Sequence, residues 1–297
     1  MASNGTLEHA GKSENLTEAE VVARFDQLAK AGRLFYDYAF RTETAQSEKM
    51  LVEFRISKAL ASKPWQTTST LDVATEPGTG PKPGSDINVN GLGVQNLNGT
   101  HELTLNMFSS YRPHLLMLTN DGYRRQWEPL DIDDFRAATQ FLSNMDQDYL
   151  VFYNCRVEGG CSRVHKHLQA IPNESFNGNS WVNIDNDAVP FAYYQARFTT
   201  PPDPEAYLKA YQAGLEAVER SLGSKTTLED GAPPHNMIMD RNRMIVVPRR
   251  AAGIDPLGAN SGGMLGTIWT QSDEKVQQWK DTGVSRLLGA AGIPKLL

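Results

Sequence analysis

The sequence predicts an α+β fold in which a mostly antiparallel sheet is flanked by helices. Short apolar runs typical of strands follow one another through the first half of the chain, and one helical pattern separates them. A regular alternation of strand and helix, which would predict a parallel sheet, is not seen there. With 297 residues, of which 40% are hydrophobic, the chain is long enough to bury a sizeable core.

The first elements follow from local patterns. Residues 17–20 have the S/T-x-x-E pattern of a capping box, and apolar residues at helical spacing come after it, so we predict a helix there. The apolar, partly alternating segment 50–60 predicts a strand. Residues 75–100 are dense in Gly, Pro and Asn and show neither helical nor strand periodicity. This pattern predicts a surface loop or, alternatively, a lid over a site.

The middle of the chain predicts strands around one helix. Residues 101–108 and 115–119 read as two strands with a short connection. Residues 131–145 place apolar side chains on one helical face, with Asp131 as the N-cap. The apolar run 149–154 predicts the next strand. These elements form an antiparallel sheet backed by helices.

The C-terminal third predicts further helices and a hairpin. Asp203 is placed to cap a helix from Pro204 to Leu222. Residues 236–247 contain two apolar runs around a polar turn, which predicts a β-hairpin. A Gly-rich turn region over residues 253–266 then leads to a final helix after Ser272.

Charge and cysteine content limit the classes of function. The net charge of −6 and the pI near 5.6 argue against broad attraction to nucleic acid or anionic membranes. Cys155 and Cys161 are too few for a disulfide framework. Residues 1–15 lack a signal-peptide core, and no apolar run reaches the roughly 20 residues of a membrane span. We therefore expect a cytoplasmic protein, with the nucleus as the alternative, that binds neither nucleic acid nor membrane.

The segment His-Lys-His-Leu-Gln at residues 165–169 contains the strongest candidates for chemistry. A strand alternates its side chains, so His165, His167 and Gln169 are expected on one face, lining one wall of a site. The small, flexible and basic run 158–164 comes directly before them. Its backbone N–H groups and the fork of its arginine suit phosphate oxygens.

Neutral imidazole is a workable nucleophile toward phosphorus. If His167 is that nucleophile, the carbonyl of His165 can accept its Nδ1 proton and aim Nε2 outward, and Gln169 can donate to the phosphoryl oxygen. Two other interpretations remain: the histidines are a partly buried polar pair, or they are half of a metal site. No third metal ligand lies close in the sequence.

The pattern H-x-H-x-Q, preceded by an Asn and a small-residue loop, resembles the transferase branch of the histidine-triad superfamily. Within that branch the chain is most similar to the diadenosine tetraphosphate (Ap4A) phosphorylases, also called ATP adenylyltransferases. The resemblance covers most of residues 50–270. It implies the antiparallel fold of the histidine-triad and galactose-1-phosphate uridylyltransferase type. The break near residues 199–204 is a candidate boundary, which gives residues 1–200 as the core and 201–297 as a C-terminal segment that completes the same fold.

The resemblance also implies a two-step transfer. His167 would attack the α-phosphorus of Ap4A and expel ATP, and inorganic phosphate would then take AMP from the histidine to give ADP. His165 would orient the nucleophile and Gln169 would stabilise the phosphoryl group. The implied substrate-binding residues are Lys63, Asn106, Asn154, Gly160, Cys161, Ser162, Arg163 and Met264.

The implied partners are a dinucleoside polyphosphate or nucleotide and inorganic phosphate. We expect no covalently bound cofactor and no dedicated metal site, although Mg²⁺ would accompany a polyphosphate. The oligomeric state is left open.

Three positions depart from the family pattern. Met107 and Ile268 stand where the resemblance implies substrate-binding lysines, and Arg163 stands where a Gln is usual. These departures leave two alternatives. One is a divergent transferase or hydrolase with another adenylylated or biosynthetic substrate, and the other is a non-catalytic dinucleotide-binding protein.

Other charged residues favour ordinary structural roles. Arginines that flank a hairpin usually form a solvated face, and a histidine at a strand edge is usually structural. These interpretations apply to Arg241, Arg243, Arg249 and Arg250, and to His101, His114 and His235.

Overall fold

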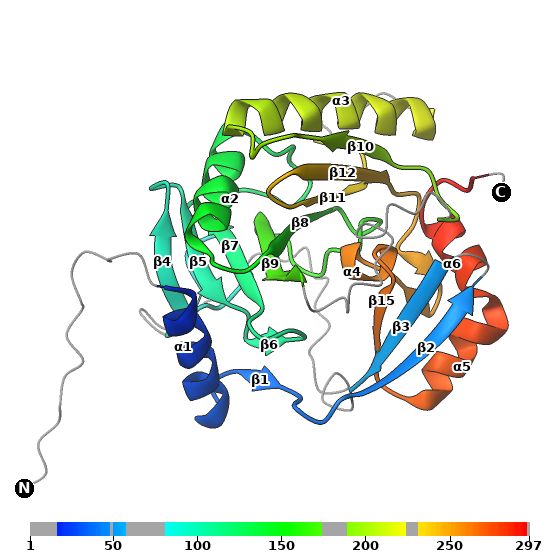
Figure 1. Ribbon diagram of the computed structural model, residues 1–297, viewed down its shortest axis with the longest axis horizontal. Coiled ribbons are helices and arrows are strands. Elements are labelled where there is room, and N and C mark those ends of the chain that lie inside the picture. The colour runs from blue at the N-terminus through cyan, green and yellow to red at the C-terminus, as the bar shows by residue number, and fades with distance from the viewer. Residues whose placement is uncertain (1–16, 48–49, 58–80, 174–188, 224–230, 296–297) are drawn as a thin grey trace, which may run out of the picture.

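An eight-stranded antiparallel sheet is the centre of the molecule (Figure 1). The computed structural model describes residues 17–47, 50–57, 81–173, 189–223 and 231–295. In spatial order the strands are β10 (Tyr194–Arg197), β12 (Arg243–Pro248), β11 (His235–Met239), β8 (Tyr149–Cys155), β9 (His167–Pro172), β7 (Leu115–Thr119), β5 (His101–Leu105) and β4 (Gly93–Leu97). The α+β class with a mostly antiparallel sheet is confirmed.

Three helices pack on one face of this sheet: α1 (Glu18–Lys30), α2 (Ile132–Asn144) and α3 (Pro204–Leu222). Each begins as its local sequence predicts. Thr17 and Asp131 both form complete capping boxes, and the side chain of Asp203 accepts a hydrogen bond from the first turn of α3. Gly223 ends α3 in the left-handed conformation, with φ of 69°.

A second layer covers the opposite face. It consists of the small sheet β15 (Thr267–Thr270), β3 (Met50–Ile56) and β2 (Arg41–Ser47), with α4 (Ser261–Met264), α5 (Asp273–Thr282) and α6 (Val284–Ala291). Two short strand pairs complete the fold, β1 (Phe35–Tyr36) with β6 (Phe108–Ser109), and β13 (Gly253–Ile254) with β14 (Leu257–Gly258). Because β15 pairs with β3 in parallel, the C-terminal segment is joined directly to the N-terminal part of the chain.

Side chains of the large sheet alternate between the two layers. In β9, Leu168 and Ala170 pack toward the helices, while Ile171 packs toward the second layer. The odd-numbered positions of the histidine segment are therefore directed toward the space between the large sheet and the second layer.

One prediction about the segment 75–100 is wrong. Residues 93–97 form β4, which pairs antiparallel with β5 through a bulge at 93/95. Leu92 and Leu97 are buried, although this part of the segment has no obvious apolar periodicity. The pairing depends on a partner strand rather than on local propensity, which explains why the sequence does not reveal it. Residues 58–60 and 75–80 lie outside the described residues.

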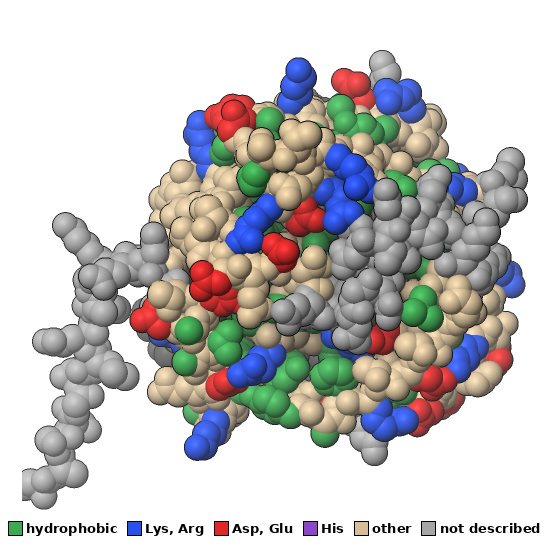
Figure 2. Space-filling view, viewed as in Figure 1, with side chains coloured by type: hydrophobic (Ala, Val, Ile, Leu, Met, Phe, Trp, Pro, Cys, Tyr) green, Lys and Arg blue, Asp and Glu red, His purple; other side chains and the backbone are tan. Residues whose placement is uncertain are grey.

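Charges are mixed over the surface. On the face shown in Figure 2, Lys and Arg side chains are interspersed with Asp and Glu, in keeping with the small net charge. Within the part of the chain that the structure describes, no helix is long and apolar enough to cross a membrane.

Candidate active site

A cavity of about 770 Å³ lies between the large sheet and the second layer. Its walls come from β9, from the loop 160–163, from residues 256–263 of the C-terminal turn, and from β15. The described lining contains two cations, Arg163 and Lys275, and one carboxylate, Asp86. The cavity thus brings together segments that are far apart in the sequence.

His167 lines this cavity, and its imidazole is held in one tautomer. Nδ1 lies 2.8 Å from the backbone carbonyl oxygen of His165. A carbonyl oxygen can only accept a hydrogen bond, so Nδ1 carries the proton and the lone pair resides on Nε2. Gln126, which is fully buried, accepts from the backbone N–H of His167 and donates to its carbonyl and to that of Asn154. Gln126 therefore fixes the start of β9, a role that the sequence does not signal.

The ring of His165 does not line the cavity, which corrects the expectation that both imidazoles share its wall. Its Nε2 lies 3.1 Å from the carbonyl oxygen of Thr119, and its Nδ1 lies 2.7 Å from Ser85 Oγ. The carboxylate of Asp86 accepts from the backbone N–H groups of Val164 and His165. Ser85 and Asp86 thus lie against His165, and burial lowers the pKa of its imidazole to about 4, which keeps it neutral at pH 7.

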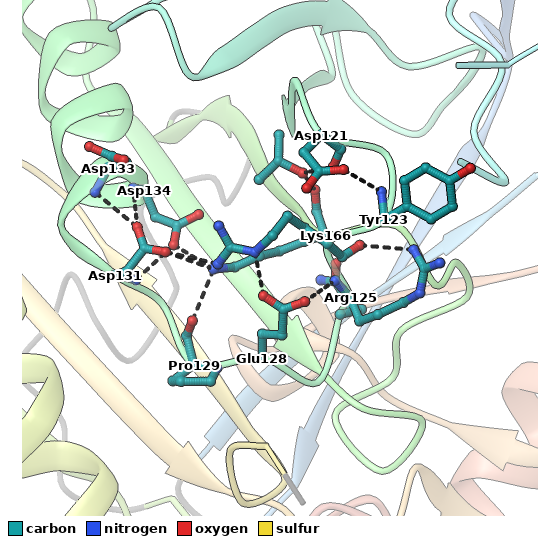
Figure 3. Close-up of polar contacts among 12 residues, drawn as sticks. Asp121, Tyr123, Arg125, Glu128, Pro129, Asp131, Asp133, Asp134 and Lys166 are labelled. Carbon is teal, nitrogen blue, oxygen red and sulfur yellow. Dashed lines mark hydrogen bonds and ion pairs between the residues drawn. The ribbon is translucent and has the colours of Figure 1, made fainter. Parts of the chain in front are cut away.

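Lys166 points to the opposite face of the sheet, as alternation requires. Its Nζ is fully buried, 2.6 Å from Asp134 Oδ2 and 2.9 Å from the carbonyl oxygen of Pro129 (Figure 3). Burial alone would raise the pKa of Asp134, but the hydrogen bond from His101 and the charge of Lys166 outweigh it and hold that pKa at about 2. This buried ion pair connects the histidine segment to the first turn of α2.

Gln169 lines the cavity beside His167 and is oriented by His114. His114 Nδ1 accepts from the backbone N–H of Ser110, so its Nε2 carries the proton and donates to Gln169 Oε1 at 2.9 Å. The carboxamide N–H₂ of Gln169 is then the group presented to the cavity. His114 also lines the cavity, and the expectation that its role is structural stays a prediction. The expectation that Gln169 donates to a phosphoryl oxygen stays a prediction.

The loop before the histidine segment lies at the cavity wall, with Gly160, Cys161, Ser162 and Arg163 all in the lining. Gly160 has φ of 83°, and a Cβ there would lie 2.8 Å from the Cα of Asn260, so a side chain cannot be accommodated. Burial raises the pKa of Cys161 to about 12, which keeps the thiol protonated. The backbone N–H groups of Gly160 and Cys161 donate to the carbonyls of Val157 and Arg156 within the loop, which corrects the expectation that they are directed at a phosphate. The loop therefore contributes the guanidinium of Arg163 to the lining rather than a nucleophile.

The remaining expected substrate-binding residues divide into three groups. Asn106 and Asn154 lie in the lining, as do Met107 and Ile268, the two positions that depart from the family pattern. Met264 is fully buried in the second core instead of at the cavity wall, because the short helix α4 directs its side chain inward; Gly262 and Gly263 line the cavity in its place. Lys63 lies outside the described residues.

The other basic residues differ in environment. His101 and His235 are buried, as a structural role requires. His101 is hydrogen-bonded to Asp134, and His235 is hydrogen-bonded to Tyr211. Arg249 does not belong to a solvated face, because its guanidinium is fully buried behind the cavity. Among the described residues, no group of three or more His, Cys, Asp or Glu side chains is arranged to hold a metal ion.

The fold and the site together define an α+β protein with a histidine-bearing strand and a glycine loop on the wall of one deep cavity. Two family models match the chain: the Ap4A phosphorylase N-terminal domain over residues 13–187 and the ATP adenylyltransferase C-terminal domain over residues 187–294. The chain belongs to the Ap4A phosphorylase and ATP adenylyltransferase family.

Two relatives from Saccharomyces cerevisiae support this assignment. Protein APA1 is 28% identical over 207 residues, which are 60% of this chain and 63% of the relative. Diadenosine 5',5'''-P1,P4-tetraphosphate phosphorylase 2 is 26% identical over 214 residues, which are 61% of this chain and 66% of the relative. The aligned region spans slightly less than two thirds of either relative.

Solved structures share the fold. The crystal structure of yeast Ap4A phosphorylase Apa2 matches with a TM-score of 0.73 at 20% identity, covering 96% of this chain and 99% of that one. The same protein in complex with Ap4A matches with a TM-score of 0.72 at 22% identity and the same coverage.

Proposed function

We propose that this protein cleaves Ap4A by phosphorolysis to ATP and ADP through a covalent adenylyl intermediate on His167. The observation that carries the proposal is the contact between His167 Nδ1 and the carbonyl of His165, since it leaves the nucleophilic lone pair on Nε2 at the cavity wall. One yeast relative is an Ap4A phosphorylase, and the fold is shared with a structure that contains Ap4A.

In the first step, Nε2 attacks the α-phosphorus, the bond from that phosphorus to its bridging oxygen breaks, and ATP leaves with the bonding electrons. In the second step, an oxygen of inorganic phosphate attacks the same phosphorus and the P–N bond breaks. ADP leaves and neutral His167 is restored. The N–H₂ of Gln169 faces the region where negative charge develops on the phosphoryl oxygens, and Arg163 supplies a cation from the cavity lining.

We also propose that Mg²⁺ enters with the polyphosphate. Mg²⁺ prefers carboxylate and phosphate oxygens. Both oxygens of Asp86, the carboxylate of the described lining, already accept backbone N–H groups. The substrate's phosphates would therefore supply the oxygen ligands. A cytoplasmic location, with the nucleus as the alternative, is proposed because both cysteines are free thiols.

The product test is direct. Protein incubated with Ap4A and inorganic phosphate should release ATP and ADP in equal amounts, and His167→Ala should release neither. If the wild type releases no product, and both proteins bind AMP with the same affinity, the chain is a nucleotide-binding protein rather than an enzyme.

A second candidate is adenylyl transfer from a substrate less charged than Ap4A. Met107 and Ile268 place apolar side chains in the cavity wall, and the described lining has only the two cations named above. If radiolabelled AMP becomes bound to His167 but inorganic phosphate does not discharge it, this second reaction is favoured over phosphorolysis.

A further inference from the structure

Among the described residues, Arg249 is the largest fully buried side chain. Its Nη2 donates to the carbonyls of Ala251, Ala252 and Ala259, at 3.0, 3.3 and 2.7 Å. Its Nε donates to the carbonyl of Ala291 at 3.2 Å. Since Ala252 and Ala259 line the cavity, Arg249 holds the C-terminal turn that forms part of that wall.

The remaining donors of Arg249 are directed toward Asn236. Nη1 donates to Asn236 Oδ1 and, at 3.5 Å, to the carbonyl of Gly159. A guanidinium can only donate, so it fixes the orientation of the Asn236 carboxamide. Asn236 Nδ2 then donates to the carbonyl of Gly159 at 2.7 Å and to Asn154 Oδ1 at 3.0 Å.

Asn154 is the end of this chain of hydrogen bonds. Its Oδ1 accepts from Asn236 Nδ2, from the backbone N–H of Ser261 at 3.0 Å and from Ser261 Oγ at 2.6 Å. With three donors on the oxygen, the group that Asn154 can present to the cavity it lines is its N–H₂. Arg249 therefore fixes the orientation of this N–H₂ group indirectly, through Asn236.

No carboxylate of the described residues lies within ion-pair distance of Arg249. Burial lowers its pKa to about 9, so it remains charged at neutral pH. A buried cation surrounded by carbonyl dipoles favours an anion on the other side of the wall, because the low dielectric strengthens the interaction.

We propose that Arg249 is a positioning residue that, through Asn236, holds Asn154 as an N–H donor to the phosphate groups of the bound nucleotide. The proposal rests on the proposed function in that it assumes a nucleotide in this cavity. The sequence places Arg249 beside a hairpin, where nothing distinguishes it from Arg241 and Arg243.

The decisive variant is Asn236→Asp. It keeps the buried volume and pairs a carboxylate with Arg249, but it puts an acceptor against Asn154 Oδ1. Asn154 must then turn its N–H₂ toward position 236 and present its oxygen to the cavity, where it repels phosphate. We expect the Kd for AMP to rise by at least about tenfold and kcat to fall in a protein that still folds. Because the new carboxylate also faces the Gly159 carbonyl, and the turned Asn154 loses its hydrogen bonds from Ser261, we expect a lower unfolding midpoint than in the wild type.

Two further variants complete the design. Arg249→Lys keeps the charge but cannot reach all of these acceptors, and we expect it to weaken AMP binding in the same direction. Arg241→Lys is the matched control, because Arg241 also donates to backbone carbonyls, those of Leu142 and Met145, but away from the cavity. Its AMP affinity should equal that of the wild type.

The measurements are AMP affinity by calorimetry, KM and kcat for Ap4A, and the unfolding midpoint, all on the full chain. If Asn236→Asp and Arg249→Lys are folded and bind AMP as the wild type does, the proposal is overturned while the reaction stands. If the wild type binds AMP but releases no product, the proposed reaction fails, and the affinities still decide the role of Arg249. A wild type that neither binds AMP nor releases product from Ap4A overturns both.

Discussion

The Nδ1 atom of His167 lies 2.8 Å from the backbone carbonyl oxygen of His165. Because this contact uses the main chain of residue 165, it does not depend on the side chain there. The ring of His165 is used elsewhere, between Ser85 and Thr119. The two histidines of the segment therefore have separate functions: His167 faces the cavity, and His165 fixes the surrounding backbone.

His165→Ala should destabilise the protein more than it impairs chemistry. The substitution removes the hydrogen bonds of the ring with Ser85 and Thr119, each of which typically contributes about 0.5–1.5 kcal/mol, while both hydroxyls keep other partners. The carbonyl that orients His167 remains. Urea unfolding and initial rates of ATP release, measured below the unfolding midpoint, test this. A fully folded His165→Ala protein as inactive as His167→Ala would show that the ring itself takes part.

Lys166→Met should cause a large loss of stability. It removes one partner of a fully buried ion pair and leaves Asp134 charged, a change that typically costs about 3–5 kcal/mol. Adding Asp134→Asn should recover part of that loss. Lys280→Met, which breaks a partly exposed pair with Glu43, is the control and should cost less than about 1 kcal/mol. If Lys166→Met and Lys280→Met lower the free energy of unfolding in urea equally, the buried ion pair does not have the stabilising role assigned to it.

Stability should fall as the pH is lowered from about 6.5 toward 4. Burial lowers the pKa of both His165 and His235 to about 4, so in this range the unfolded chain binds protons that the folded chain does not. Each residue contributes on the order of 3 kcal/mol to the fall in the free energy of unfolding over this pH range. Asp134, with its pKa at about 2, adds a further loss only below about pH 4.

Unfolding midpoints measured between pH 4 and 7 test this dependence. In His235→Gln the slope over this range should be shallower, because one of the two groups no longer titrates. An unchanged slope in that variant would show that other groups dominate the acid sensitivity.

Gln169→Leu should lower kcat far more than it raises KM. Its N–H₂ faces the phosphoryl group in the proposed reaction, and losing one such donor typically costs about 10²–10³ in rate. His114→Leu leaves that amide in place but frees it to rotate, so its effect on kcat should have the same direction and be smaller. If His114→Leu is as active as the wild type, the orienting hydrogen bond has no role in the reaction.

Met107→Lys should tighten the binding of Ap4A. Met107 lines the cavity and is only partly buried, so a lysine there can extend toward the polyphosphate. A charged hydrogen bond of this kind is worth about 1.5–3 kcal/mol, roughly a tenfold decrease in KM or more. Met107→Gln is the uncharged control. If Met107→Lys does not change the KM for Ap4A, the polyphosphate does not bind next to residue 107.

Patterns between neighbouring residues predict where the helices begin and which strand side chains share a face. The helices begin where Thr17, Asp131 and Asp203 cap them, because a capping side chain acts within one turn. The positions of His167 and Gln169 on one face follow from strand alternation. The sequence does not predict strand β4, because its pairing with β5 is a tertiary interaction.

Long-range contacts decide the parts of the site that the sequence does not reveal. Ser85 and Asp86 lie about 80 positions before His165 in the sequence and contact it, so strand alternation alone does not predict that this ring lies away from the cavity wall. His114 and Arg249 have ordinary sequence surroundings, and their roles depend on Gln169 and Asn236, from other strands. A single sequence carries no pattern that links such pairs.

The proposed adenylyl-His167 intermediate should accumulate in the absence of inorganic phosphate. The intact mass of the wild-type protein mixed with Ap4A should increase by one adenylyl group, the label should map to His167 and be acid-labile, and added phosphate should discharge it as ADP. His167→Ala should show no increase. Steady release of ATP and ADP by a protein on which no adduct forms, or an adduct that persists in His167→Ala, would contradict His167 as the nucleophile.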